Sequence, residues 1–185
     1  MYYSAIKTCD ISNGVGVRTS LFVSGCRHRC DGCFNSDTWS FDAGEPFTEE
    51  GTLSEILDSM RFHYIDGLSI LGGEPLEPEN QPEVLRIVRM VKRVYPSKTI
   101  WLWTGFTWAE LTIINTRART DMLPQILENV DVLVDGRFML DYRDITLRFR
   151  GSPNQRIIDV RKSLEAGHVV EWTDDEICRT RRWPR

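Results

Sequence analysis

Short apolar runs alternate along this chain with longer stretches whose apolar residues recur at helical spacing. The short runs indicate strands, which we expect at residues 18–25, 68–71, 99–104, 130–134 and 155–160. The helical spacing indicates helices, which we expect at residues 49–63 and 80–95 and in two pieces within 107–129. Continuous apolar strands are typical of parallel sheets that are buried on both faces. The alternation therefore predicts an α/β layer fold.

The length of the chain limits which α/β fold it can form. A closed eight-fold barrel takes about 250 residues, whereas this chain has 185. We expect a single domain over residues 1–185, folded as an incomplete (β/α) barrel or as a strongly twisted, mostly parallel sheet. A short polar tail is expected from about residue 161 onward.

Several distinctive segments come directly after expected strands. In open parallel sheets, ligands bind outside the carboxyl ends of the strands. We therefore expect one rim of the sheet to carry the functional site. The segments that should meet there are Cys26–Cys33, Gly72–Pro75, 104–105 and 135–138.

The composition excludes several classes of function. The chain has a net charge of −4, whereas a dedicated duplex-DNA binder needs an excess of basic residues. No apolar run reaches the roughly 18 residues that span a bilayer. The first ten residues lack the charged start and apolar block of a signal peptide. We therefore expect a cytoplasmic protein with neither a nucleic-acid nor a membrane partner.

Three of the five cysteines lie within eight residues, in the sequence Cys26-Arg-His-Arg-Cys30-Asp-Gly-Cys33. An odd, clustered set does not suit a secreted disulfide scaffold, and in a reducing cytoplasm it favours metal binding or redox work. Three thiolates at this spacing can bind three irons of a cubane cluster and leave the fourth iron open. The alternative is structural zinc, which takes four ligands. The fourth would be His28, at a cramped spacing, or the distant Cys9.

A glycine-rich turn, Leu71-Gly72-Gly73-Glu74-Pro75, follows the next expected strand about 40 residues after the cysteines. Two glycines let the backbone approach a ligand closely, and backbone carbonyls together with Glu74 can accept hydrogen bonds from an ammonium group. The cysteine loop and this turn together resemble the radical S-adenosylmethionine (SAM) superfamily.

The details resemble one branch of that superfamily, the activating enzymes of anaerobic ribonucleotide reductase. Most superfamily members carry an aromatic residue just before the third cysteine, whereas this chain has Gly32 there and Phe34 after it. Residues 25–35 as a whole look like the loop of these activating enzymes. Further matching segments are 10–18, 103–107, 134–138 and 150–156.

The resemblance implies a radical SAM-type fold and a set of site residues. Cys26, Cys30 and Cys33 would hold a [4Fe–4S] cluster, and SAM would bind its free iron. The residues implied to contact SAM are Gly32, Cys33 and Phe34, then Gly72, Gly73 and Glu74 at its methionyl end, and Thr104 as a weaker ribose contact.

The resemblance also implies the reaction. A reduced flavodoxin-type donor would supply one electron, SAM would be cleaved, and the resulting 5′-deoxyadenosyl radical would take a hydrogen atom from a backbone glycine of the reductase large subunit. A homodimer fits the same picture. The alternatives are an activase of another glycyl-radical enzyme and a non-catalytic zinc-binding adaptor.

Several residues keep two interpretations. Arg18, Asn154, Gln155 and Arg156 can contact a partner or substrate, or serve only turn hydrogen bonding. Cys9 and Cys178 are interpreted as ordinary thiols. The last seven residues carry four arginines, which form a solvated end or help to dock an acidic partner.

Overall fold

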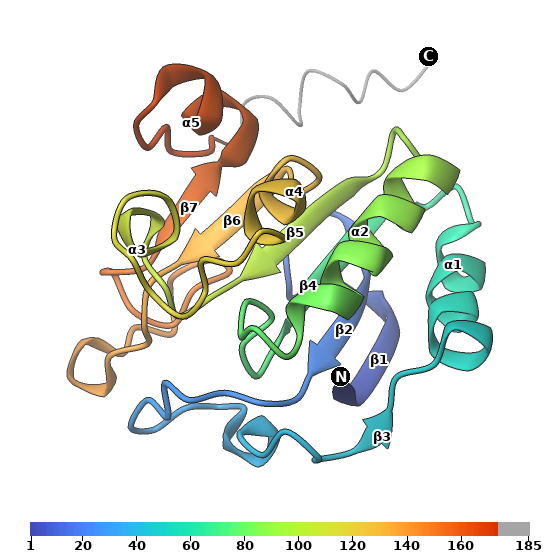
Figure 1. The fold of residues 1–185 in the computed structure, drawn as a ribbon, viewed down its shortest axis with the longest axis horizontal. Coiled ribbons are helices and arrows are strands. Elements are labelled where there is room, and N and C mark those ends of the chain that lie inside the picture. Colours follow the sequence, from blue (N-terminus) through green and yellow to red (C-terminus); the bar gives the residue numbers. More distant parts are fainter. Residues whose placement is uncertain (174–185) are drawn as a thin grey trace.

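A seven-stranded sheet organises residues 1–173, the part of the chain that the computed structural model describes. Its strand order is β3-β1-β2-β4-β5-β6-β7 (Figure 1). The strands are β1 (Tyr2–Asp10), β2 (Val17–Val23), β3 (Glu45–Pro46), β4 (Ile65–Gly72), β5 (Thr99–Trp103), β6 (Val132–Asp135) and β7 (Arg156–Asp159). The helices are α1 (Ser54–Met60), α2 (Gln81–Val94), α3 (Trp108–Thr112), α4 (Leu123–Leu127) and α5 (Val160–Ala166). Short helical turns η1 (Ser36–Thr38), η2 (Glu49–Leu53) and η3 (Leu140–Tyr142) complete the set.

The four central strands, β2, β4, β5 and β6, are parallel to one another, and the outer strands pair antiparallel to the strands beside them. The sheet does not close. The expected α/β class and the open sheet with a parallel centre are therefore confirmed. The antiparallel last strand has a simple cause. Parallel neighbours need a long crossover that is usually a helix, whereas the segment from residue 136 to 155 contains only the turn η3.

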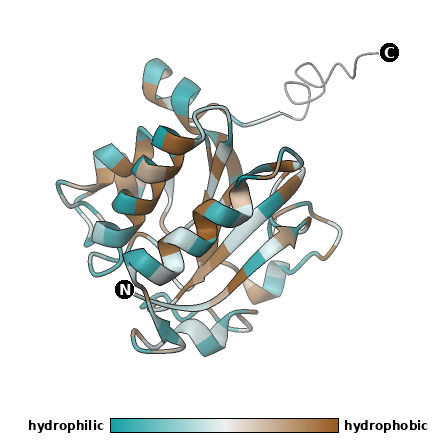
Figure 2. Cartoon of the chain, turned by 90° about the vertical axis from the view of Figure 1, so that its right-hand side faces the viewer, coloured by the Kyte–Doolittle hydropathy of each residue, from teal (hydrophilic) through white to brown (hydrophobic). Residues whose placement is uncertain are grey.

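Helices α1 to α4 cover one face of the sheet and bury the main hydrophobic core (Figures 1 and 2). The helical spacing of apolar residues in 80–95 predicts one buried face made of Val84, Ile87, Val88, Val91 and Val94, and the first four are fully buried on α2. Val94 is 45% exposed because it is the last residue of the helix.

Aromatic packing fills the opposite face of the sheet. Trp101 of β5 is buried there, and its ring lies 5.7 Å from that of Trp103 and 5.1 Å from that of Trp172. The indole of Trp103 donates a hydrogen bond of 2.8 Å to the carbonyl of Phe149, in the segment between β6 and β7. This segment and the return of the chain at Trp172 therefore cover the face that carries no helix.

Two expectations were wrong in detail. The helix expected at 49–63 begins with the π-helical turn η2 and ends at Met60, so Tyr64 lies outside it and is 47% exposed. The chain after residue 161 is not simply a polar tail, because α5 forms there. Asp159 caps α5 through the amide of Lys162, and Gly167 ends it with a positive φ of 72°.

The chain then returns to the sheet, where the amide of Trp172 donates to Ile157. Strand β1 was missed because most of its side chains are exposed or half-buried. Within residues 1–173, none of the helices has the length and apolar character that crossing a membrane requires. Cys178 and the four terminal arginines lie outside the described residues.

Candidate functional site

The loops that follow β2 and β4 lie in direct contact at one rim of the sheet. The amide of Gly73 donates to the carbonyl of Val23 at 2.7 Å, and the amide of Glu74 donates to the carbonyl of Gly25 at 2.8 Å. A Cβ atom on Gly73 would lie only 2.8 Å from the Gly25 oxygen. Glycine is therefore needed at this position so that the cysteine loop and the glycine-rich turn can pack together.

The cysteine loop is bent at two residues with positive φ, Arg29 at 47° and Gly32 at 67°. The amide of Cys26 donates to the carbonyl of Trp39, and that of Cys33 donates to the carbonyl of Cys30 at 3.1 Å. These bonds anchor the start of the loop to the chain at Trp39 and place Cys30 and Cys33 on one short turn.

The thiols of the loop are free and half-buried. Burial, reinforced by the charge of Glu74, raises the pKa of the Cys26 thiol to about 11. Burial and the neighbouring Cys33 raise the pKa of Cys30 as well. At Cys30 the charge of Arg137 opposes the shift but does not outweigh burial, so the neutral form of the Cys26 and Cys30 thiols is favoured.

The donor set fits a cluster held by three cysteines better than a four-ligand zinc site. In the described part of the chain, no three His, Cys, Asp or Glu side chains already converge as a metal centre. The His28 ring is turned toward other side chains: Nδ1 accepts from Arg137 at 3.1 Å, and Nε2 faces Glu74 Oε2 at 3.1 Å without a hydrogen bond. Cys9 lies near the amino end of β2, because its neighbour Asp10 pairs with Arg18. Neither residue supplies the fourth ligand that zinc takes.

A small cavity opens beside the cysteine loop, with a volume of about 140 Å³. Pockets for whole small-molecule ligands usually measure roughly 300–1,000 Å³, so this cavity matches only one end of a ligand the size of SAM. Its lining residues are Asn35, Leu71, Gly72, Gly73, Trp103, Thr104, Gly105 and Gln155.

Four of these lining residues were predicted as site residues from the sequence: Gly72, Gly73, Thr104 and Gln155. The other four were not named individually as site residues, although all of them lie in segments that the sequence singled out. Trp103 and Gly105 flank Thr104 in a segment already singled out. Their position at the end of a parallel strand was the signal that could have found them.

The Glu74 carboxylate is buried and engaged on both oxygens. Oε1 accepts from the amide of Leu76 at 2.9 Å and from the Thr104 hydroxyl at 2.8 Å, and Oε2 accepts from the amide of Gly105 at 2.7 Å. Only 1% of the Glu74 side chain is exposed. The carboxylate therefore ties the ends of β4 and β5 together, while Gly72 and Gly73 line the cavity itself.

Gly32 and Phe34 face the segment between β6 and β7 rather than the cavity. A Cβ atom on Gly32 would lie 2.7 Å from Leu140, which packs against this glycine. The Phe34 ring is 68% exposed and lies 5.9 Å from the ring of Phe138. In this arrangement the cavity wall near the third cysteine is Asn35 instead of Phe34.

The predicted residues at the start of β7 lie on the same rim. Gln155 lines the cavity and donates to the carbonyl of Gly136 at 3.0 Å. Asn154 donates to the carbonyl of Arg137 at 2.8 Å. Arg156 pairs with the buried carboxylate of Asp135, its Nε donating at 3.0 Å. These bonds hold the β6–β7 segment in place.

Arg18 is separated from this rim. It lies near the opposite, amino ends of the parallel strands and is 1% exposed. Its guanidinium donates to Ser69, to the carbonyls of Val15 and Leu68, and to both oxygens of Thr99. This placement favours the structural interpretation over contact with a partner.

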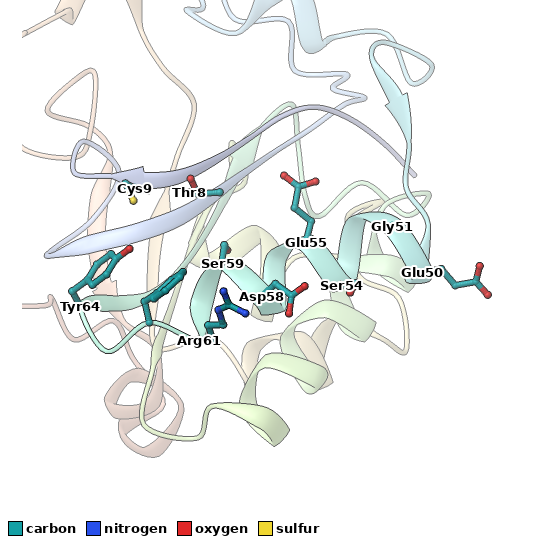
Figure 3. A pocket seen from close by; sticks show the side chains of 11 residues that line it. Thr8, Cys9, Glu50, Gly51, Ser54, Glu55, Asp58, Ser59, Arg61 and Tyr64 are labelled. Carbon is teal, nitrogen blue, oxygen red and sulfur yellow. The ribbon is translucent and has the colours of Figure 1, made fainter.

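A larger cavity of about 560 Å³ lies between β1 and α1. Cys9 and Thr8 line it from β1, and Glu55, Asp58 and Tyr64 line it from α1 and the turn that follows (Figure 3). None of the predicted ligand-binding residues lies there. Size alone therefore does not mark the functional site of this chain.

Comparison with known proteins supports an iron–sulfur cluster in this chain. The family model described as a 4Fe-4S single cluster domain matches residues 12–158. That span includes all three cysteines of the loop and the residues that line the small cavity.

Several curated relatives share most of the chain, and each is called an anaerobic ribonucleoside-triphosphate reductase-activating protein. The relative from Salmonella typhimurium is 40% identical over 163 residues, which is 87% of this chain and all of the relative. The one from Pasteurella multocida is 45% identical over 85% of this chain and 96% of its own length. The one from Enterobacteria phage T4 is 39% identical over 85% of this chain and 93% of its own length.

Proposed function

Because this chain belongs to the family of anaerobic ribonucleoside-triphosphate reductase-activating proteins, we propose that it activates an anaerobic ribonucleotide reductase by generating a glycyl radical on it. The proposed cofactors are a [4Fe–4S] cluster and SAM. The protein is in that case an enzyme of the radical SAM type, at work in the cytoplasm with a flavodoxin-type electron donor.

The observation that carries this proposal is the contact between the cysteine loop and the glycine-rich turn. Cys26, Cys30 and Cys33 are the proposed cluster ligands, and the backbone of Gly72 and Gly73 lines the cavity beside them. A cluster held by these cysteines would supply the one-electron reduction of SAM on which removal of a hydrogen atom from the partner's glycine depends.

The residues of the chain would bind and orient SAM and exclude water from the site. The free carbonyl groups of a glycine turn can accept from the methionyl ammonium. Thr104 and Gln155 offer polar groups at the cavity wall, and Trp103 offers an apolar ring fixed by its bond to Phe149. A site that excludes water protects a reactive radical from side reactions.

Exposed apolar side chains beside the cysteine loop support a protein partner on this rim. Large exposed apolar patches often mark interaction sites. Figure 1 shows the β6–β7 segment and the cysteine loop together at the lower left. The exposed residues are Phe34 at 68%, Met139 at 43%, Leu140 at 46%, Tyr142 at 57% and Ile145 at 82%.

The test is to mix the anaerobically reconstituted protein with SAM, reductant and an anaerobic ribonucleotide reductase. We expect a glycyl-radical signal on the reductase by electron paramagnetic resonance. A glycyl-radical lyase serves as the matched control and should stay silent. If SAM is cleaved normally while the radical forms only on the lyase, the partner is a different glycyl-radical enzyme.

A further inference from the structure

His28, between the first two cysteines of the loop, is inserted into a slot formed by three other loops. Its side chain is only 3% exposed. A Cβ atom on Gly105 would lie 2.5 Å from the imidazole ring, so the ring occupies space that only glycine leaves free. The ring of Phe106 meets the imidazole edge-on at 4.5 Å between centroids. A surface loop histidine would have none of these contacts.

The two ring nitrogens face different partners. Arg137 Nε donates to Nδ1 at 3.1 Å, so Nδ1 carries the lone pair and, in the neutral ring, Nε2 carries the hydrogen. Nε2 lies 3.1 Å from Glu74 Oε2, yet no hydrogen bond joins the two atoms, and Nε2 is buried without a partner. Buried polar atoms are normally paired, so this nitrogen is poised to bond to Glu74 after a small rotation.

The outer partner of His28 is itself held in place. Arg137 pairs with Glu110 through a bond of 2.9 Å. Glu110 belongs to the capping box that starts α3, in which its carboxylate accepts from the Thr107 amide at 2.8 Å. A continuous chain of contacts therefore runs from helix α3 through Arg137 to His28, and from there to Glu74.

We propose that His28 is a positioning residue that fixes the cysteine loop relative to Glu74 and the glycine-rich turn. The inference rests on the proposed function, since it concerns the distance between the cluster ligands and the cavity for SAM. The His28 ring joins two loops that carry different parts of the site. Loss of the ring leaves the three cysteine ligands in the chain but frees the cysteine loop to shift against the cavity.

Three substitutions separate the roles of the two nitrogens. A glutamine reaches as far as Nε2 and keeps a donor for Glu74, whereas an asparagine reaches only as far as Nδ1 and keeps an acceptor for Arg137. The variants are His28→Gln, His28→Asn and His28→Leu. The matched control is His63→Asn, at an exposed histidine in the turn that precedes β4, near the amino ends of the parallel strands.

The experiment measures three quantities on the anaerobically reconstituted proteins: the iron and sulfide content, the dissociation constant for SAM, and amide hydrogen exchange of residues 72–77 and 104–107 without SAM. We expect normal cluster content in all variants. The dissociation constant should rise about tenfold or more in His28→Asn and His28→Leu, the usual loss when a residue that orients a metal site is removed. His28→Gln should stay within about threefold of the parent and the His63→Asn control. Exchange should be faster only in the Asn and Leu variants.

Equal SAM affinity and equal exchange in all proteins would overturn the proposal. Cluster loss in all three His28 variants would overturn it too, because His28 would then act as a ligand. If the parent protein holds a cluster but does not bind SAM, the proposed function fails. The exchange data still decide in that case whether His28 holds the two loops together.

Discussion

Two buried polar clusters occupy opposite ends of the same parallel strands, and they differ in how completely they are satisfied. At the amino ends, Arg18 makes five hydrogen bonds and lies over the ring of Trp101. At the carboxyl ends, His28 Nε2 has no hydrogen-bond partner, and burial raises the pKa values of the Cys26 and Cys30 thiols. A small cavity lies beside the second cluster.

The difference distinguishes polar side chains that stabilise the fold from polar side chains that are available to a ligand. Burial lowers the pKa of Arg18 to about 9, although the charges of Asp66, Asp131 and Asp10 oppose the shift. The buried cation is nevertheless tolerated, because all three nitrogens of the guanidinium donate to nearby acceptors. At the carboxyl ends the pairing is incomplete, because His28 Nε2 has no hydrogen-bond partner. Incomplete pairing beside a glycine-lined cavity is the pattern expected where a ligand completes the site.

The largest effect is expected from a substitution at the carboxyl ends of the strands, which should leave the side chains around Arg18 untouched. Cys30→Ala should abolish retention of the iron–sulfur cluster and cleavage of SAM, because two thiolates cannot replace three as ligands. The folded protein should remain soluble, with a free energy of unfolding close to that of the apo parent. Iron and sulfide analysis and urea unfolding measure the two quantities. Cys9→Ala is the control and should retain its cluster; a fully active Cys30→Ala protein contradicts the assignment.

The next largest effect is expected from removing Arg18, at the amino ends of the strands. Arg18→Leu leaves several buried acceptors unpaired and should lower the free energy of unfolding by about 3 kcal/mol. The fraction that remains folded should still assemble a cluster, because Arg18 is remote from the rim. Arg161→Leu removes an 86% exposed arginine and should change stability by less than about 0.5 kcal/mol. Loss of cluster assembly in folded Arg18→Leu protein would show that the two ends are not independent.

A smaller effect sharpens the role of the slot around His28. Gly105→Ala places a methyl group against the imidazole and should lower stability by about 1–3 kcal/mol, as overpacking usually does. SAM affinity should fall with it. In a His28→Ala background the same change should have little further effect on affinity, because the clash is gone. Additive losses in the double variant would mean that Gly105 acts independently of His28.

The smallest effect concerns pH. Glu77 is buried and accepts hydrogen bonds from Arg117 and from the amide and side chain of Arg27. Burial raises its pKa, but these bonds outweigh it and hold the pKa below the usual 4.5. A lowered pKa contributes stability that is present above about pH 4.5 and is lost as the pH falls through the lowered value. Glu77→Gln should therefore flatten the loss of stability in acid, as followed by urea unfolding between about pH 3 and 7; an unchanged pH profile would refute this role.

The sequence was most informative about the rim. The cysteine loop and the glycine turn were located correctly because close packing and metal binding demand particular residue types at fixed spacing. Strand β1 and helix α5 were missed, since a strand with mostly exposed or half-buried side chains and a seven-residue helix carry little periodicity. The role of the His28 ring could not be predicted, because its partners Arg137 and Glu74 come from distant parts of the chain.

The most direct test of the central claim is to reconstitute the protein anaerobically, reduce it, and record electron paramagnetic resonance spectra with and without SAM. We expect the signal of a reduced [4Fe–4S] cluster in the parent, a change in that signal when SAM is added, and neither in Cys30→Ala. One tightly bound zinc ion with no acid-labile sulfide, or a cluster whose spectrum is indifferent to SAM, would contradict the account.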